Sequence, residues 1–283
     1  MRIKIGLKEG FLLLIALLFA FYWSNRHLQV TYYTYGDAAL PAAFEGCVIV
    51  QLSDLHGGSF GEDNAALLQK IEQEEPDYIV ITGDLLDKDT ENPMDFAAAL
   101  GERLAAIAPT YFVTGNHEWS IPRTSHIKKA LTSAGVTVLS NEFVELTREG
   151  ERIVLAGVDD INGYADQKKP EELCEEIYET YGDCYWLLLA HRNDQFAKCY
   201  CHLQANLTLS GHAHGGLIRL PFTDGLVDSS RTLFPTHTAG FYQMEGAHLL
   251  VSRGLGNSGY SRRLFNCPEL VVLTLSGQET GDN

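Results

Sequence analysis

The hydrophobic positions of the chain fall into short, nearly continuous runs of four to six residues, separated by polar segments. A run of this length, rich in Val, Ile and Leu, is typical of a strand that is buried on both faces. We therefore predict strands at 47–52, 78–81, 110–113, 136–139, 143–146, 152–156, 185–190, 207–210, 248–252 and 270–275.

Segments with helical spacing of apolar residues separate the first of these strands. Ala65, Leu68 and Ile71 repeat in this way within 64–75, with charged residues on the opposite face. The alternation of strand and helix predicts parallel β-α-β units. Further helices are expected at 96–107, 125–134, 170–178 and 195–202.

The predicted organisation is one globular α/β domain behind an N-terminal segment. Residues 29–43 include a polar, tyrosine-rich stretch and are expected to form a linker. No interior linker marks a second boundary, so we predict a single domain at 44–277 that contains two sheets. A polar tail follows at 278–283.

Residues 1–28 have the pattern of a membrane segment. Arg2, Lys4 and Lys8 precede an uncharged apolar stretch at 11–23, which is about as long as the core of a signal peptide. Aromatic residues occupy the place of a small-residue cleavage site and are typical of an interfacial belt. We predict an uncleaved signal anchor, with a cytoplasmic N-terminus and an exported body because the basic residues come first. The alternative is a buried core helix.

The charge balance limits the classes of function. With 37 acidic and 21 basic residues among 283, the formal net charge is -16. No basic stripe is present that would neutralise phosphates, so stable nucleic-acid binding is not expected. A local metal cluster would still attract an anionic substrate, because bound cations dominate the electrostatics around them.

Asp, Asn and His residues gather where the predicted strands end. Each of the first three strands finishes in a short glycine-containing loop, and later strands are followed by histidines. The carboxyl ends of parallel strands lie together, which is where such sheets bind ligands. In chain order these residues are Asp54, His56, Asp84, Asn116, His191, His212 and His214.

These side chains are oxygen and nitrogen donors of the kinds that bind Mn, Fe or Zn. Their number suits two metal ions if one carboxylate bridges them. Two ions ~3.5–4 Å apart can activate a bridging water and neutralise the attacking and leaving oxygens of a phosphoryl transfer. For the segment 210–216 taken alone, a histidine-containing surface turn is the alternative.

The complete set resembles the calcineurin-like metallophosphoesterases. The family pattern D-x-H, G-D-x-x-D, G-N-H-[ED], H and G-H-x-H occurs in that order at Asp54–His56, Gly83–Asp87, Gly115–Glu118, His191 and Gly211–His214. The joint match is specific, although each block alone would be weak. The resemblance implies a four-layer α-β-β-α sandwich of two mixed sheets.

The resemblance also implies roles for the site residues. One metal would be bound by Asp54, His56 and His214, and the other by Asn116, His191 and His212. Asp84 would bridge the two metals and is counted, with His117, among the catalytic residues. His117 would contact the phosphate and protonate the leaving group, since an imidazole titrates near neutral pH. Asp87 and Glu118 would not bind the metals but would orient the residues that do, and Glu118 would help to hold His117.

Longer stretches resemble a narrower group within the family. Residues 53–58, 212–221 and 252–259 are similar to bacterial membrane-anchored or exported phosphodiesterases related to UDP-2,3-diacylglucosamine pyrophosphate hydrolases. Arg219 and Arg253 are weaker candidates for substrate contact. Asp159 and Asp160 are expected in a solvated turn, with a substrate role as the alternative. Three aromatic residues of the segment 217–242 are expected to pack it down, or alternatively to line an apolar groove: Phe222, Phe234 and Phe241.

The resulting hypothesis is a binuclear metal-dependent phosphohydrolase, anchored in the membrane with its catalytic domain outside the cytoplasm. A phosphodiesterase or pyrophosphatase with a metal-bound hydroxide as nucleophile is favoured, using two divalent ions (Mn, Zn or Fe). An envelope lipid or a cell-wall phosphate would fit the anchor as substrate. The alternatives are a phosphomonoesterase or nuclease on the same site, and a metal-binding scaffold with little turnover.

Overall fold

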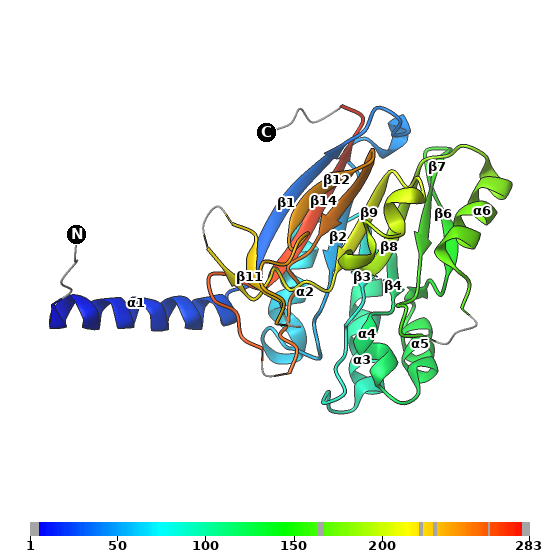
Figure 1. The fold of residues 1–283 in the computed structure, drawn as a ribbon. Coiled ribbons are helices and arrows are strands. Elements are labelled where there is room, and N and C mark those ends of the chain that lie inside the picture. Colours follow the sequence, from blue (N-terminus) through cyan, green and yellow to red (C-terminus); the bar gives the residue numbers. More distant parts are fainter. Residues whose placement is uncertain (1–5, 164–166, 221–222, 229–230, 260, 279–283) are drawn as a thin grey trace.

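Two six-stranded sheets pack face to face, and helices cover their outer faces (Figure 1). The computed structural model describes residues 6–163, 167–220, 223–228, 231–259 and 261–278. In spatial order, the first sheet consists of β1 (Gln29–Gly36), β14 (Glu269–Ser276), β2 (Val48–Leu52), β3 (Tyr78–Thr82), β4 (Thr110–Val113) and β5 (Thr137–Val138). The second consists of β12 (Gly240–Met244), β13 (Ala247–Val251), β9 (Leu207–Gly211), β8 (Trp186–Arg192), β7 (Glu151–Gly157) and β6 (Glu142–Arg148).

Both sheets are mixed, as predicted. In the first, β2, β3, β4 and β5 run parallel, whereas β14 is antiparallel to β2. In the second, β7, β8, β9 and β13 are parallel, and an antiparallel strand closes each edge. The predicted α/β sandwich of two mixed sheets is therefore confirmed.

Three hydrophobic clusters fill the spaces between the layers. One joins the first sheet to α2 (Ala65–Gln73), α3 (Pro93–Ile107) and α5 (Thr124–Ser133), one lies between the sheets, and one joins the second sheet to α6 (Pro170–Tyr181). Along β3, Ile79 and Ile81 belong to the outer cluster and Val80 to the inner one. This alternation explains the continuous apolar runs, because a strand covered on both sides has no solvent-facing position.

The expected linker at 29–43 is wrong, because it contains β1. This strand pairs in parallel with β14 along its whole length, from Gln29 opposite Glu269 to Gly36 opposite Ser276. Its tyrosines and threonines make the strand look polar throughout, although its positions differ in burial. Tyr35 lies in the core between the sheets, whereas Tyr32 is exposed. An edge strand rich in tyrosine and threonine has the composition of a polar linker, although it belongs to the domain.

The later part of the chain departs most from prediction. The helix expected at 195–202 is two separate turns, η3 (Asn193–Gln195) and η4 (Tyr200–His202). The ribbon of β10 (Ile218–Arg219) and β11 (Gly225–Val227), and the strand β12, lie in a segment for which no strand was expected. Additional short turns are η1 (Ala42–Phe44), η2 (Glu62–Asn64) and α4 (Asn116–Ser120).

The N-terminal helix α1 (Leu7–Arg26) projects from the body (Figure 1). It is long and apolar enough to cross a membrane, and only 6% of its most apolar window is buried. The alternative of a buried core helix is therefore wrong. Its last turn is held by the body: Phe265 donates its backbone N–H to Ser24 Oγ (2.8 Å), and Asn25 exchanges two hydrogen bonds with the backbone of Arg263. Arg2, Lys4 and most of the tail at 278–283 lie outside the described residues.

Candidate metal centre

All seven predicted ligands converge where strands of the two sheets end. Asp54 and His56 follow β2, Asp84 follows β3, and Asn116 begins α4 directly after β4. The second sheet contributes its histidines from the end of β8 and from the loop after β9. Three overlapping clusters of potential ligands result: Asp54 with His56 and His214; His56 with Asp84 and His117; and Asp84 with His191 and His212.

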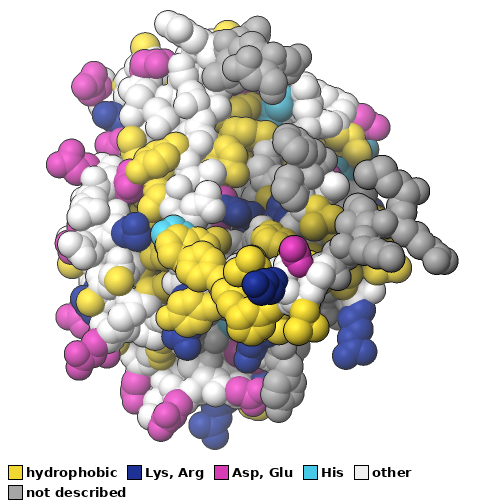
Figure 2. Space-filling view, turned by 90° about the vertical axis from the view of Figure 1, so that its left-hand side faces the viewer, with side chains coloured by type: hydrophobic (Ala, Val, Ile, Leu, Met, Phe, Trp, Pro, Cys, Tyr) yellow, Lys and Arg dark blue, Asp and Glu magenta, His cyan; other side chains and the backbone are white. Residues whose placement is uncertain are grey.

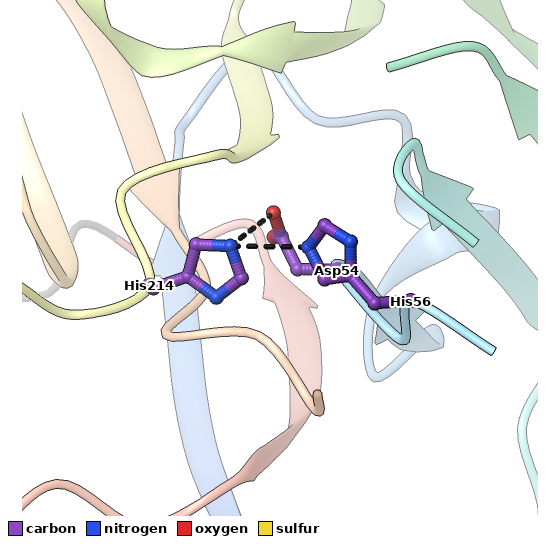
Figure 3. A group of neighbouring side chains, drawn as sticks. All are labelled: Asp54, His56 and His214. Atoms are coloured by element: carbon purple, nitrogen blue, oxygen red, sulfur yellow. Dashed lines mark hydrogen bonds and ion pairs between the residues drawn. The ribbon is translucent and has the colours of Figure 1, made fainter. Parts of the chain in front are cut away.

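We call Asp54, His56 and His214 the Asp54 group (Figure 3). The Nε2 atoms of His56 and His214 lie 3.1 Å apart, and Asp54 Oδ1 lies 3.5 Å from His214 Nε2. All three residues are buried. Asp54 is held in place by the Ser53 hydroxyl, which donates to Oδ2 at 2.6 Å, and by the backbone N–H of His212.

We call Asn116, His191 and His212 the His191 group. His191 Nε2 lies 3.2 Å from Asn116 Oδ1 and 3.2 Å from His212 Nδ1. The other ring nitrogen of His191 hydrogen-bonds the carbonyl of Thr82 at 2.8 Å. The Thr82 carbonyl thus fixes the orientation of the ring from the end of β3.

Asp84 lies between the two groups. Its Oδ2 atom is 3.2 Å from His191 Nε2, 3.8 Å from His56 Nε2 and 4.0 Å from His117 Nε2. Its Oδ1 atom accepts the backbone N–H of His117 at 2.8 Å, which leaves Oδ2 directed at the histidines. One carboxylate therefore contacts residues of both groups.

His117 is the more accessible histidine beside this carboxylate. Its side chain is 24% exposed, whereas that of His191 is fully buried. Its Nδ1 atom lies 3.4 Å from Asp87 Oδ1, and its Nε2 atom lies 3.3 Å from the hydroxyl of Ser258. Asp87 also approaches the ring of His56, at 3.8 Å. A substrate arriving from solvent could reach His117 without displacing a buried residue.

Glu118 holds the loops rather than the ring of His117. Its carboxylate accepts the backbone N–H groups of Asp84 (2.9 Å), Leu86 (3.0 Å) and Gly115 (2.7 Å). The expected support of His117 is therefore indirect, through the backbone that carries it. A Cβ at Gly115 would collide with the Asp84 carboxylate, so glycine is required for this close approach.

The electrostatics separate neutral imidazoles from one charged pair. Burial lowers the pKa of His56 to about 4 and that of His212 to about 3, and it lowers the pKa of His214 well below its ordinary value. His191 differs: burial would lower its pKa, but the charge and hydrogen bond of Asp84 raise it to about 10. The pKa of Asp84 is lowered because the same pairing outweighs its burial. Neutral imidazole is the form that binds metals, so a cation in the His191 group would displace the proton that Asp84 stabilises on His191.

Backbone strain marks the same residues. Five of the seven predicted ligands have φ between 50° and 70°, a region that non-glycine residues rarely adopt: Asp54, His56, Asp84, His212 and His214. Such conformations persist only where the surrounding structure enforces them, and they cluster at functional sites. The loops are shaped to bring these side chains together at the expense of local backbone energy.

Sequence reasoning missed the residues that support the histidines. Arg263 is fully buried and donates to His214 Nδ1 (3.3 Å) and to the carbonyl of Gly256 (2.7 Å). Asn266 donates to the carbonyl of His214 at 2.7 Å. Arg192 lies 3.4 Å from His212 Nε2. Only Arg192 carried a signal in the sequence, its position next to His191.

Two sequence interpretations near the site need correction. Asp159 and Asp160 are not in a solvated turn: they are buried and form ion pairs with Lys128 (2.6 Å) and Arg192 (2.7 Å). A buried carboxylate requires such a partner. The surface-turn alternative for 210–216 is also wrong, because His214 is buried within the Asp54 group.

The two weaker substrate candidates have structural partners. Arg253 forms an ion pair with Glu269 at 2.9 Å and reaches Thr31 at 3.3 Å. Arg219 donates to the carbonyl of Gly215 (3.0 Å) and to Thr238 Oγ1 (2.9 Å). These contacts account for both side chains without a substrate.

The chemistry of the donors fits divalent cations. In the Asp54 group, two buried ring nitrogens face each other beside a carboxylate. In the His191 group, an amide oxygen and two ring nitrogens converge beside Asp84. Nitrogen lone pairs and carboxylate charge directed at one point are stabilised by a cation.

Comparison with known proteins agrees with this chemistry. The sequence model of the calcineurin-like phosphoesterases matches residues 47–216, more than half of the chain. The chain is 31% identical to YkuE of Bacillus subtilis, an uncharacterised metallophosphoesterase, over 91% of this chain and 88% of that protein. It is 31% identical to the phosphodiesterase YaeI of Escherichia coli, over 80% of this chain and 81% of that protein.

A further relative combines the same domain with a membrane protein. A Bos taurus transmembrane protein with a metallophosphoesterase domain is 34% identical over 83% of this chain, which spans 54% of that protein. The matched residues 47–216 include every predicted ligand and the two residues, Asp87 and Glu118, that support them. The chain therefore belongs to the calcineurin-like phosphoesterase family and is a hydrolase of phosphoric esters.

Proposed function

We propose that the protein is a phosphodiesterase or pyrophosphatase with a centre for two divalent cations, anchored in a membrane by α1. The position of Asp84 Oδ2 carries the proposal, because this atom lies 3.2 Å from the His191 group and 3.8 Å from the Asp54 group. A carboxylate shared in this way matches a binuclear site. The phosphodiesterase YaeI, similar over most of the chain, supports the choice of a diester.

The Asp54 group and Asp84 would hold one cation, and the His191 group and Asp84 would hold the other. When bound, two such ions lower the pKa of an attacking water and neutralise charge on the phosphoryl oxygens. His117 would hold the proton at Nε2 that the leaving oxygen takes up, while Asp87 orients the ring at Nδ1. Glu118 would keep the loops of Asp84 and His117 in register.

The location and the substrate are part of the proposal. One helix suited to crossing a membrane, and a relative that is a transmembrane protein, support an anchor. We place the catalytic domain outside the cytoplasm, with an envelope lipid or a cell-wall phosphate as the phosphodiester or pyrophosphate substrate. Protease treatment of sealed right-side-out and inverted vesicles tests this: degradation of the domain only in inverted vesicles would overturn the orientation.

The activity is tested on the full chain in detergent, stripped of metal and then supplied with Mn or Zn. We expect hydrolysis of bis-4-nitrophenyl phosphate to return with metal and to exceed hydrolysis of 4-nitrophenyl phosphate. Asp84→Asn is the control. Preference for the monoester would indicate a phosphomonoesterase, and two bound metals without turnover of either ester would contradict an esterase of broad range.

A further inference from the structure

Exposed apolar side chains gather at the base of α1. Outside α1, eight large hydrophobic side chains among the described residues are exposed, and half of them lie on two loops at this end of the molecule. These four are Leu220 (43% exposed), Leu233 (67%), Phe234 (73%) and Phe265 (46%), which we call the anchor-side patch. The expectation that Phe234 packs its segment down is therefore wrong. Phe222 lies outside the described residues.

The loops of the patch are joined to one another and to the helix. Arg219 donates its backbone N–H to the carbonyl of Leu264 (3.1 Å), and Leu264 donates to that of Leu217 (2.9 Å). Phe234 donates its N–H to Leu226 in the same segment, at 2.9 Å. Phe265 in turn donates to Ser24 in the last turn of α1. The patch is thus a fixed surface around the point where α1 leaves the body.

The figures place this surface on one side of the molecule. In Figure 1 the segment of β11 and the loop before β14 lie on the side from which α1 projects. Figure 2 views that side with α1 directed at the viewer, so the hydrophobic side chains at its centre include those of α1 itself, and Lys and Arg side chains lie around them. A chain of net charge -16 presents the exposed Arg26, Arg231 and Arg262 in these same segments. Asp224 and Asp228 lie in the same segments and offset the positive charge of these arginines. The inference therefore depends on the apolar side chains rather than on charge.

If α1 spans a bilayer, its length determines the level at which the patch lies relative to the lipid headgroups. Twenty residues of helix span about 30 Å, the thickness of the hydrocarbon core of a bilayer. Tyr22 and Trp23 near its C-terminal end are exposed and of the type that lies at the membrane–water interface. Residues hydrogen-bonded to Ser24 and Asn25 would therefore stand at the level of the lipid headgroups.

We infer that the anchor-side patch contacts the lipid bilayer, inserting Leu220, Leu233, Phe234 and Phe265 at the boundary between headgroups and acyl chains. This inference rests on the proposed anchoring by α1. Apolar side chains with nearby arginines suit the surface of a membrane that contains anionic lipids. The body would then stand at a fixed height and orientation, rather than at the end of a free tether.

One residue of the patch, Phe265, lies on the loop that also borders the metal centre. Seven residues before Phe265, the hydroxyl of Ser258 approaches His117 Nε2 at 3.3 Å, and Arg263 contacts His214. A bilayer against Phe265 would bring phosphoesters of the headgroup region close to His117. The docking surface thus offers a physical reason for a substrate presented at the membrane.

The test uses a photoreactive residue in the full chain, expressed in membranes. We would place p-benzoylphenylalanine at position 234 or 265, at Phe19 in α1 as the reporter of the anchor, and at Tyr178 as the control. Tyr178 is 68% exposed, so it matches Phe234 in accessibility, and it lies on α6 of the second sheet. After irradiation, lipid adducts are measured by mass spectrometry.

We expect lipid adducts at positions 19, 234 and 265, and at least tenfold less adduct at 178. Adducts at 19 without adducts at 234 and 265 would overturn the docking surface and leave the anchor standing. Equal adducts at 178 and 234 would also overturn it, because contact would then be unspecific. No adduct at 19 would remove the anchor and the docking surface together. Unchanged thermal unfolding of each variant, against the unsubstituted chain, shows that the fold is retained.

Discussion

The Asp54 group and the His191 group each contain two histidines and one oxygen donor, but their histidines are supported by different parts of the molecule. His191 lies in β8, and its ring is fixed by the carbonyl of Thr82 at the end of β3. His214 lies in a loop, and its ring and carbonyl are held by Arg263 and Asn266 from another loop. The central histidine of one group is thus fixed by strands of both sheets, whereas His214 of the other depends on the loop that binds α1.

This difference indicates which group can respond to the membrane. The backbone of Arg263 is bonded to Asn25 of α1, and its side chain is bonded to His214, so one residue connects the helix to a ligand. No comparable connection to α1 is described for His191, which is enclosed by strands. We therefore expect changes near α1 to affect the Asp54 group and to leave the His191 group intact.

Asp84→Asn should have the largest effect, because the Asp84 carboxylate approaches residues of both groups. The substitution preserves shape but removes the charge between His56 and His191. We expect turnover of a chromogenic phosphodiester to fall by more than about 100-fold, the upper end of what loss of a contact that merely supports a ligand causes, because Asp84 would itself be a ligand of both cations. Metal content measured by mass spectrometry should fall in both groups. Loss of one metal only would show that Asp84 is not shared.

His117→Asn should reduce turnover without reducing metal content, since His117 lies beside the groups and belongs to neither. For a diester with an alkoxide leaving group, we expect a loss of about 10²- to 10⁴-fold. A nitrophenolate leaves without help from an acid, so the loss for the nitrophenyl ester should be much smaller. Equal losses on the two esters would contradict proton donation by His117.

Arg263→Lys and Arg192→Lys separate the two groups directly. Each arginine contacts one histidine, Arg263 that of the Asp54 group and Arg192 that of the His191 group. Loss of such a supporting contact lowers metal affinity by about 10- to 100-fold. In calorimetric titrations of the metal-free protein, each variant should weaken a different binding step.

A double-mutant cycle assigns the steps. With His214→Ala already present, Arg263→Lys should have no further effect on metal affinity, whereas Arg192→Lys should retain its full effect. If both arginine variants weaken the same binding step, the two arginines support the same group of ligands, and the proposed difference between the groups is wrong.

The sequence predicted the ligands at strand ends better than the residues of the loop that binds α1. Asp54, Asp84 and Asn116 follow apolar runs whose ends must meet in a parallel sheet, so their proximity follows from connectivity. Arg263 follows no such rule. It is a charged residue in an irregular segment, and only the fold reveals that it is buried against His214.

The same contrast explains the errors outside the site. The local pattern of β1 predicts a linker because its pairing partner, β14, is 240 residues away (Gln29 opposite Glu269) and the strand is not apolar throughout. The local pattern around Asp159 and Asp160 predicts solvated carboxylates because the cations that pair with them are remote in sequence. The local periodicity of hydrophobic residues predicts helices and strands, but it contains no information about polar side chains that pair across long distances in the sequence.

Asn25→Ala should have the smallest effect and is the most specific test of the connection to α1. It removes the two hydrogen bonds to the Arg263 backbone, each worth ~1 kcal/mol net, together with one to the Phe21 carbonyl and one from Asn257, without touching a ligand. We expect metal affinity of the Asp54 group to fall by about fivefold and that of the His191 group to stay unchanged. Asn141→Ala, which removes a hydrogen bond from the backbone N–H of Asp159 at a position with no described contact to α1, is the control. If the control lowers the affinity of the Asp54 group as much as Asn25→Ala does, general loss of stability explains the result, and the loop of Arg263 does not connect the helix to the site.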